Sequence, residues 1–363
     1  MLRLLKIYLL PGAVLQSVMI GGGYGTGREL VEYFTRHGMG GGLLGMLLAT
    51  VLISAIFAVS LALAVRFQAY DYRTFFKILL GRAWFLFEIL GVLLFIVVLA
   101  VMGAAAGQIV ETELGLPAIG GGVIMLAAVV TLNFFGRDWV TRVLASWSVL
   151  LYAVFIAYFL SVIWQLQSSV GLGSIAEKFS WEVNGDWLVG GLQYALYNVA
   201  GIPIILYAAR AVETQRQAMA SGAIGGMIAM LPGILFHLSF SGAYPAILDQ
   251  PLPVYYMFDT LAAPLLQGLY LLVLFGTFVE TGAGNIQGFI ERLDNWWVER
   301  TGMPLNRINH GAVAGVALLA SGTLSVFGIV NLIAQGYGTL AWGYLFVYLI
   351  PLFSVGVYRL TRG

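Results

Sequence analysis

The segment "GGGYGTGREL", residues 21–30, brings together groups that can bind a polar molecule or an ion. Its glycines tolerate unwound backbone, and unwound backbone offers free carbonyl oxygens and N–H groups. Arg28 and Glu29 lie within the segment, and Glu32 comes one helical turn after Arg28. These groups suit reversible binding of a solute or a cation, so the segment predicts a binding site.

A second segment, "LQYALYNVAGIPIILYAAR" at residues 192–210, carries helix-breaking residues inside an apolar run. Proline lacks an N–H group and clashes with the preceding turn, and glycine permits unwound geometry at little steric cost. We therefore expect a helix that is interrupted around Asn198, Gly201 and Pro203, with Tyr197 beside the interruption.

Glu280 and Thr281 lie in the middle of the apolar run "LYLLVLFGTFVETGAGNIQGFIERL", residues 269–293. An acidic side chain at the centre of a membrane helix costs about 2.5–3.5 kcal/mol and normally faces the bundle interior with a partner. Glu280 is therefore a candidate residue for a coupling ion. The alternative is a structural role, either an ion pair with Arg28 or a hydrogen bond to another helix.

The composition places these segments in a membrane. Of the 363 residues, 60% are hydrophobic and 10% are charged, and the mean hydropathy is +0.91. Soluble domains contain about 25% charged residues. The long continuous apolar runs favour helices over the short alternating strands of a β-barrel. We expect an all-α polytopic membrane protein whose apolar N-terminal segment is a retained helix rather than a cleaved signal peptide.

The hydropathy pattern predicts about ten transmembrane helices. They are expected at residues 7–36, 41–65, 83–110, 118–135, 139–165, 187–211, 217–243, 263–293, 308–327 and 333–358. With the N-terminus inside, 15 of the 18 Lys and Arg residues fall on the cytoplasmic side, in agreement with the positive-inside rule. We therefore expect an integral protein of a prokaryotic-type inner (plasma) membrane, with both termini in the cytoplasm.

Five spans on each side of a longer loop predict two inverted halves. The expected units are a first five-helix repeat at residues 1–166, an extracellular linker at 167–186 and a second five-helix repeat at 187–363, within one membrane domain. The interrupted first and sixth spans then occupy equivalent places in the two halves. Two broken helices in corresponding positions are a sequence pointer to a binding site at the membrane midplane.

The glycines of the first span have a second interpretation. Small residues also let membrane helices pack closely, without any ligand. The density of the cluster, together with the break in the sixth span, favours a site over packing. Backbone that leaves the helix cannot face lipid and must line an enclosed or water-filled cavity.

The two breaks and the 5+5 order of spans resemble the leucine-transporter (LeuT) fold of the amino acid–polyamine–organocation (APC) superfamily. Within it, "GYGTGRELVEYF", "YDYRTFFKILLG" and "QPLPVYYMF" most resemble the YkvI-type membrane proteins. The resemblance implies alternating access, a solute bound between spans one, three, six and eight, and often a sodium ion between spans one and eight.

The resemblance and the breaks together give a candidate residue set. Candidate solute-binding residues are Gly21, Gly23, Tyr24, Gly25, Thr26, Gln108, Tyr197, Asn198 and Gly201. Candidate residues for the coupling ion are Met19, Gly22, Thr277, Glu280 and Thr281. Arg28, Glu29 and Glu32 are expected in a gate or charge network. The tyrosines and Gln108 have an alternative role in hydrogen bonds between helices or at the membrane interface.

This chain departs from the sodium-site pattern, because Glu280 stands where sodium-coupled members have a hydroxyl residue. A carboxylate can coordinate sodium or can itself carry a proton. Sodium is favoured over the proton, since the fifth span has no Lys to replace the ion, and both alternatives stay open.

Other classes of function are disfavoured. The sequence has no cysteine, no HExxH or GxSxG motif and three scattered histidines, so we expect neither an enzyme nor a bound cofactor other than a sodium ion. The net charge of +1 gives no indication of a nucleic-acid partner. Two broken helices suit an occluding site better than the open pore of a channel.

The sequence predicts a cation-coupled symporter of a small organic solute, an amino acid or a related zwitterion, embedded in the lipid bilayer. The alternative is a solute-binding membrane sensor of the same fold that does not transport. The identity of the solute, the direction of transport and the oligomeric state cannot be read from the sequence.

Overall fold

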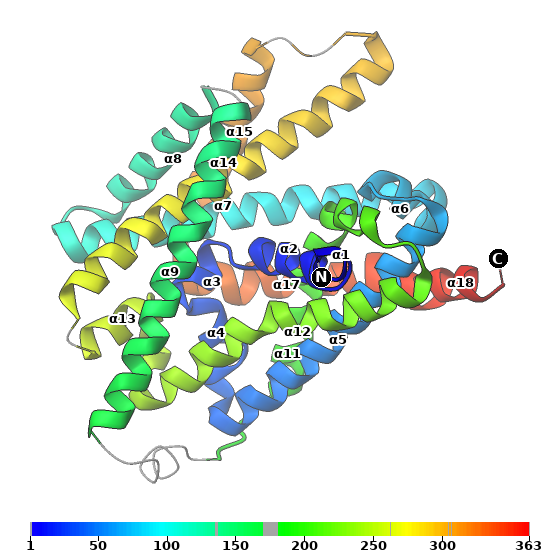
Figure 1. Ribbon diagram of the computed structural model, residues 1–363. Helices are drawn as coiled ribbons and strands as arrows, with labels where there is room; N and C mark the ends of the chain where they lie inside the picture. Colours follow the sequence, from blue (N-terminus) through cyan, green and yellow to red (C-terminus); the bar gives the residue numbers. More distant parts are fainter. Residues whose placement is uncertain are drawn as a thin grey trace.

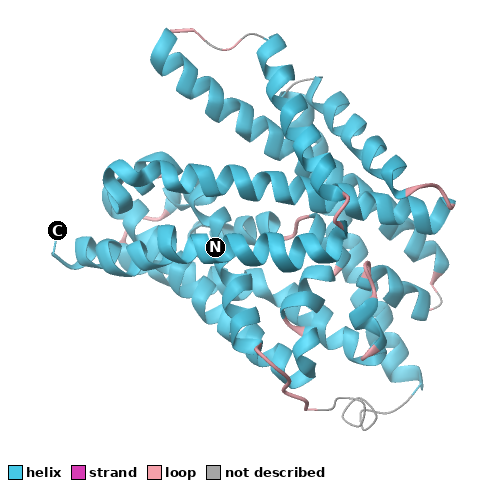
Figure 2. Cartoon of the chain, turned by 180° about the vertical axis from the view of Figure 1, so that it is seen from behind, coloured by secondary structure: helices cyan, strands magenta, loops and turns pink. Residues whose placement is uncertain are grey.

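The computed structural model describes residues 2–134, 137–169, 181–261, 263–303, 305 and 307–362, and Figures 1 and 2 show the chain from opposite sides. All regular elements within these residues are helices, as the composition predicts. Residues 170–180, which belong to the expected linker 167–186, lie outside the described part of the chain.

Six helical segments are long and apolar enough to cross a membrane. They are Arg28–Phe67, Tyr72–Leu114, Trp187–Ala211, Gln215–Ala243, Pro264–Asp294 and Gly328–Arg362. Four shorter apolar helices are Leu5–Met19, Ala118–Leu132, Val149–Trp164 and Gly315–Ser325. These segments lie at the places of the expected spans, so the chain is a polytopic membrane protein. The number of crossings and the division into two repeats stay predictions.

The first half of the chain begins with a divided helix. Its pieces are α1 (Leu2–Leu4), the π-helical turn η1 (Leu5–Leu9), α2 (Leu10–Met19), α3 (Gly22–Thr26), α4 (Arg28–Tyr33) and the 3-10 turn η2 (Thr35–His37). The following elements are α5 (Gly38–Phe67), α6 (Tyr72–Leu80), the 3-10 turn η3 (Gly81–Trp84), α7 (Phe85–Leu114), α8 (Ala118–Phe134) and α9 (Arg137–Ser169).

The second half also departs from regular α-helix in several places. Its first elements are α11 (Trp187–Asn198), the 3-10 helix η4 (Val199–Ala211), α12 (Gln215–Phe240), the 3-10 turns η5 (Ser241–Ala243) and η6 (Ala246–Asp249), α13 (Pro253–Thr260) and α14 (Pro264–Thr301). Then come α15 (Arg307–Ser325), α16 (Gly328–Asn331), the π-helical η7 (Leu332–Tyr337), α17 (Gly338–Tyr344), the π-helical η8 (Leu345–Leu349) and η9 (Leu352–Gly356), and α18 (Val357–Arg362).

Local sequence determines where some helices begin. The Thr214 hydroxyl accepts the Gln217 N–H at 3.2 Å, and the Gln217 side chain accepts the Thr214 N–H at 3.4 Å. This reciprocal pair satisfies N–H groups at the start of α12 that have no partner within the helix. In the same way, the Asp71 carboxylate accepts the Thr74 N–H at 2.9 Å at the start of α6.

The helices pack in two groups (Figure 1). In the first group, α5 packs against α11 and α12, and α2 packs against α12 and η4. In the second group, α7 packs against α8 and α15, and α14 packs against α7, α8 and α9. The short helix α3 contacts both α7 and α14, so the broken first span lies where the two groups meet.

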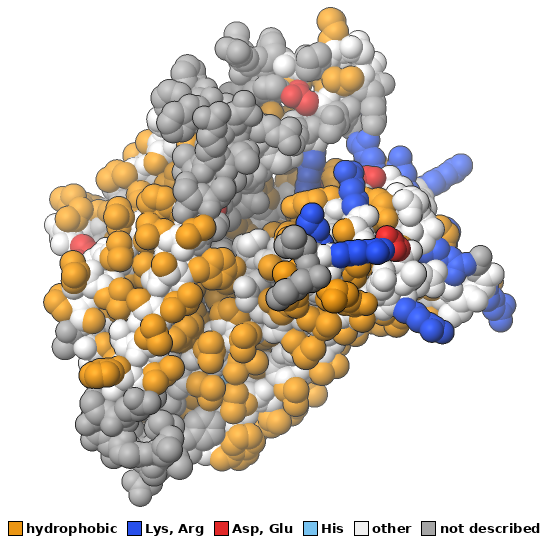
Figure 3. All heavy atoms as spheres, in the orientation of Figure 1, with side chains coloured by type: hydrophobic (Ala, Val, Ile, Leu, Met, Phe, Trp, Pro, Cys, Tyr) orange, Lys and Arg blue, Asp and Glu red, His pale blue; other side chains and the backbone are white. Residues whose placement is uncertain are grey.

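Charged side chains gather at one end of the molecule. Figure 3 shows hydrophobic side chains over much of the visible face and Lys and Arg side chains around the end where α1, α6 and α18 lie. We call this the basic end. These helices carry Arg3, Arg73, Lys77, Arg359 and Arg362. The segregation agrees with the charge asymmetry of the sequence and gives the molecule a polar end beside an apolar lateral surface.

Glycines bring α12 and α5 together. A Cβ atom added to Gly222 would overlap the backbone of Ala58, and one added to Gly226 would overlap Ser54. Small residues at such crossings let helix backbones approach within van der Waals contact, which stabilises helix association in a membrane. In contrast, a Cβ atom added to Gly268, in α14, would meet no atom within 4 Å.

Gly222→Ala should therefore lower the thermal stability of the purified protein, by about 1–3 kcal/mol for an overpacked contact. Gly268→Ala is the matched control and should leave stability unchanged or slightly higher, because alanine favours helix over glycine. The measurement is the melting temperature in detergent. Equal melting temperatures for the two variants would contradict the packing of α5 on α12.

Candidate functional site

The backbone of the first span opens between α2 and α3. α2 ends at Met19, Ile20 leaves helical geometry with φ −77° and ψ 70°, and Gly21 is extended. The Ile20 N–H still donates to the Gln16 carbonyl at 2.9 Å, whereas the Gly21 N–H turns to the Met19 carbonyl at 2.8 Å. The break predicted from the glycine cluster is therefore present at Ile20 and Gly21.

A second break follows at Gly27, between α3 and α4. Gly27 has φ +82°, a left-handed conformation that side chains other than glycine rarely adopt. A Cβ atom there would also lie 2.9 Å from Phe240 and Val254. The Thr26 hydroxyl stabilises this turn, because it donates to the Gly23 carbonyl at 2.7 Å and accepts the Arg28 N–H at 3.1 Å. The turn changes the direction in which α4 presents its side chains.

The Glu29 carboxylate folds back over the break. A Cβ atom on Gly23 would overlap this carboxylate, so the carboxylate occupies the space that a side chain at position 23 would fill. Glu29 is buried and accepts hydrogen bonds from the Tyr197 hydroxyl and the Tyr24 backbone N–H. The first and sixth spans are thereby joined through one carboxylate at the break.

A cavity of about 390 Å³ lies beside the break, between the two helix groups. The candidate residues that line it are Met19, Gly21, Gly23, Glu29, Tyr197, Asn198, Gly201, Glu280 and Thr281. They come from the first span, from α11 and η4, and from α14, and Phe87, Phe95 and Met102 add a wall from α7. Spans one, three, six and eight therefore contribute to one cavity.

Other candidate residues make contacts within the protein. Tyr24 is fully buried and packs edge-on against Phe236, and the Gly25 carbonyl accepts the Tyr270 hydroxyl at 2.9 Å. The Thr277 hydroxyl donates to the Val273 carbonyl at 2.8 Å within α14.

The two remaining candidates are Gly22, in α3, and Gln108, in α7. Gly22 begins α3 next to Gly21. Gln108 donates to Thr112 at 3.2 Å in the last turns of α7.

From the sequence, these glycines have two possible roles, at a binding site or in close helix packing, and the structure differs between positions. A Cβ atom on Gly21 would meet nothing within 4 Å, and Gly21 lines the cavity. A Cβ atom on Gly25 would lie 3.0 Å from Leu274, and one on Gly201 would lie 2.8 Å from Val18. Gly25 and Gly201 thus allow close packing between helices, whereas Gly21 leaves open space at the cavity.

The sixth span changes helix type instead of opening. The α-helix α11 ends at Asn198, and the chain continues as the 3-10 helix η4, which contains Pro203. Proline has no N–H for an α-helical bond, and long 3-10 stretches are uncommon outside strained or hinge-like segments. The predicted interruption is therefore present as a change of helical pitch beside the cavity.

Sequence reasoning missed three side chains from the last spans that line the cavity, namely Tyr337, Tyr344 and Arg292. Tyr337 stacks on Tyr197 with ring centroids 4.8 Å apart. It ends the π-helical segment η7, and π-helical turns frequently occur at functional sites. The available signal was the spacing of Tyr337 and Tyr344, which puts two aromatic rings on one face two turns apart.

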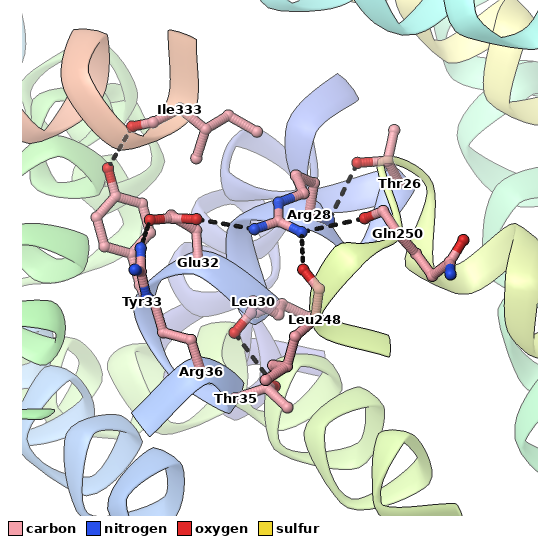
Figure 4. Close-up of polar contacts among 10 residues, drawn as sticks. All are labelled: Thr26, Arg28, Leu30, Glu32, Tyr33, Thr35, Arg36, Leu248, Gln250 and Ile333. Carbon is pink, nitrogen blue, oxygen red and sulfur yellow. Dashed lines mark hydrogen bonds and ion pairs between the residues drawn. The ribbon is translucent and has the colours of Figure 1, made fainter. Parts of the chain in front are cut away.

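Arg28 belongs to a network away from the cavity lining (Figure 4). Its guanidinium donates to the Leu248 carbonyl at 2.7 Å, to the Gln250 carbonyl at 3.1 Å and to Glu32 at 2.8 Å. Arg36 also pairs with Glu32. This network fastens α4 to the segment between η6 and α13. Arg28 thus pairs with Glu32 rather than Glu280, and of the three residues expected in a charge network it is Glu29 that faces the cavity.

A second charged contact lies at the end of the cavity nearer the basic end. Arg292 of α14 is 3.6 Å from Glu88 of α7, and its guanidinium lies 4.5 Å from the ring centroid of Tyr72 in α6. Since Arg292 lines the cavity and α6 lies at the basic end, the cavity extends from the break toward that end.

Comparison with known proteins supports the same architecture. No protein-family model matches the chain. It is 25% identical over 291 residues to the uncharacterized membrane protein YkvI of Bacillus subtilis (strain 168), a match that covers 77% of this chain and 79% of that protein. The likeness to YkvI agrees with the resemblance carried by the sequence motifs.

Two solved structures superpose on nearly the whole chain. A mutant of the Eremococcus coleocola manganese transporter has a TM-score of 0.57 and 15% identity, and the match covers 96% of this chain and 78% of that one. MhsT in complex with L-phenylalanine has a TM-score of 0.58 and 15% identity, with coverage of 98% and 96%. These likenesses show the fold, and the chain has the LeuT fold.

The cavity geometry predicts a difference in chemical access between two glycines of the same break. In this Cys-free chain, Gly21→Cys should react with a small water-soluble maleimide, because a side chain at position 21 points into open space. Gly25→Cys should react at least about tenfold more slowly, because its side chain packs against Leu274. The measurement is the labelling rate in membranes, and similar rates at both positions would disprove the placement of the cavity.

Proposed function

We propose that the chain is a secondary active transporter, which couples entry of a cation to symport of a small organic solute, an amino acid or a related zwitterion, by alternating access. The proposal places it in a prokaryotic-type inner membrane with both termini in the cytoplasm. The observation that carries it is the cavity between two helix groups at the broken first span. The manganese transporter of the same fold supports a transport role.

The cavity has the features of a site for a small solute. Binding pockets of ligands are concave, mostly apolar and supplied with a few polar groups that fix orientation. Here Phe87, Phe95 and Phe289 supply apolar surface, while Glu29 and Asn198 supply polar groups. MhsT, which shares the fold, has been solved with L-phenylalanine, and this supports an amino acid or a compound of similar size.

The coupling ion is proposed to bind near Glu280. Met19, Glu280 and Thr281 line the same cavity and offer a backbone carbonyl, a carboxylate and a hydroxyl. Hard cations such as sodium prefer oxygen ligands of these kinds. Thr277, one turn earlier on α14, and Gly22, beside the break, complete the proposed set. A proton carried by Glu280 remains the alternative ion.

Alternating access requires that one side of the cavity closes while the other opens. The Arg28–Glu32 pair and the two carbonyls of residues 248 and 250 fasten the side away from the basic end. At the other end, the Arg292–Glu88 contact of 3.6 Å is longer than a hydrogen bond and partly exposed. These contacts support a conformation that is closed on the outside and faces the cytoplasm.

Glu280→Gln should abolish solute accumulation driven by an ion gradient while solute counterflow persists. Glutamine keeps the size of the side chain and removes both the charge and the proton-carrying group. The measurement is uptake into proteoliposomes under a sodium gradient and then under a pH gradient alone, which also identifies the ion.

The control for this variant is Glu111→Gln, which neutralises an exposed carboxylate near the C-terminal end of α7. It should transport like the parent. Accumulation by Glu280→Gln at the parent rate would remove Glu280 from the coupling mechanism. Solute binding without flux in the parent protein would favour the sensor function instead.

A further inference from the structure

One wall of the cavity combines a carboxylate with aromatic rings. Glu29 accepts the Tyr197 hydroxyl, and Tyr197 stacks on Tyr337. All three side chains line the cavity, although each is at most 6% exposed. Tyr337 thus stacks on Tyr197 and itself forms part of the cavity wall.

This combination matches the chemistry of an organic cation. An ammonium or guanidinium group is attracted to the face of an aromatic ring and forms charge-assisted hydrogen bonds with a carboxylate. The Tyr197 hydroxyl and the Tyr24 N–H hold the Glu29 carboxylate in place, so its position does not depend on the solute. A preorganised anionic group of this kind binds a cation at a small cost in conformational entropy.

The same geometry disfavours recognition of a carboxylate at the break. The Tyr24 N–H of α3, a donor that could otherwise meet an anionic solute, already donates to Glu29. The Glu29 carboxylate also fills the space above Gly23. An anionic group of the solute placed here would meet a like charge in a site of low dielectric constant, where repulsion is strong.

The remaining lining is consistent with a cationic solute. Glu280 adds a second acidic side chain, whereas Arg292 lies at the other end of the cavity and contacts Glu88. The Tyr344 hydroxyl is buried and has no hydrogen-bond partner among the described residues, so it is available to a polar group of a bound molecule. Phe87, Phe95 and Phe289 can surround an apolar body.

We infer that the solute is recognised through an ammonium or guanidinium group, held by the Glu29 carboxylate against the ring of Tyr337, and that a solute carboxylate is not required. This inference rests on the proposed function of the same cavity and narrows its substrate class to amines, other organic cations and zwitterions bound through their amino group. Asn198 and Tyr344 orient the rest of the molecule.

The test compares three probes that differ only in their charged groups. Phenethylamine has the ammonium, 3-phenylpropionate has the carboxylate, and L-phenylalanine has both. Binding is measured with the full-length protein in detergent by thermal stabilisation and isothermal titration, with tetramethylammonium and guanidinium as smaller cations. Phenethylamine should bind at least as tightly as L-phenylalanine, and 3-phenylpropionate should bind about tenfold more weakly or not at all.

Two pairs of variants separate the contributions of charge and ring. Glu29→Gln should weaken phenethylamine binding about tenfold or more, whereas Glu111→Gln should not change it. Tyr337→Phe keeps the aromatic face and should bind like the parent, but Tyr337→Leu should lose affinity for phenethylamine and for tetramethylammonium. Because Tyr337→Phe keeps the ring, the Tyr337 pair remains informative even if Glu29→Gln fails to fold.

The inference is overturned if 3-phenylpropionate binds as tightly as phenethylamine, if no cationic probe binds the parent protein, or if Glu29→Gln folds and binds phenethylamine normally. Even after such results, the proposed transport function stands if another solute accumulates in proteoliposomes under an ion gradient. If binding depends on the ammonium group but no solute flux occurs, the proposed transport function is contradicted and the inferred recognition of the cation is supported.

Discussion

The structure depends on one constraint, that backbone polar groups inside a membrane need partners. A continuous helix satisfies them internally, and a helix that stops at Met19 and resumes at Gly22 does not. The protein meets this need with its own side chains and with a cavity. Thr26 binds the Gly23 carbonyl, Tyr270 binds the Gly25 carbonyl and Glu29 accepts the Tyr24 N–H. α3 lies between the two helix groups, where these partners and the cavity are present together.

The glycines at positions 23 and 27 make the Glu29 arrangement geometrically feasible. Gly27 takes a left-handed conformation that turns α4, and Gly23 has no side chain to collide with the returning carboxylate. Glu29 then meets Tyr197 from the sixth span, and Tyr197 stacks on Tyr337 from the last. Three segments far apart in the sequence thus converge at one acidic side chain in the cavity wall.

The two arginines near the ends of this region have different surroundings. Arg28 is buried and pairs with Glu32, and two of its contacts, to the Leu248 and Gln250 carbonyls, fix α4 to the segment that leads into α13. Arg292 is partly exposed, at a longer distance from Glu88, and beside the ring of Tyr72. A buried guanidinium with several partners is costly to separate from them, whereas a partly exposed contact is weak. The contacts at the Arg28 end are therefore harder to separate than the contact at the Arg292 end.

The sequence alone determined the all-α membrane architecture, because long apolar runs with few charges have no other stable fold in lipid. It also located the break at Gly21, the irregular helix at Pro203 and the acidic residue Glu280 beside the cavity, since each is a local departure from an apolar helix. Only the tertiary structure decided that Gly25 packs against Leu274 while Gly21 faces open space. The tertiary structure also decided that Glu29 lines the cavity while Arg28 and Glu32 do not, and that Tyr337 lies at the site. These outcomes depend on how the turn at Gly27 and the π-helical η7 orient side chains toward other helices. Spacing along one helix contains no information about which distant helix lies opposite.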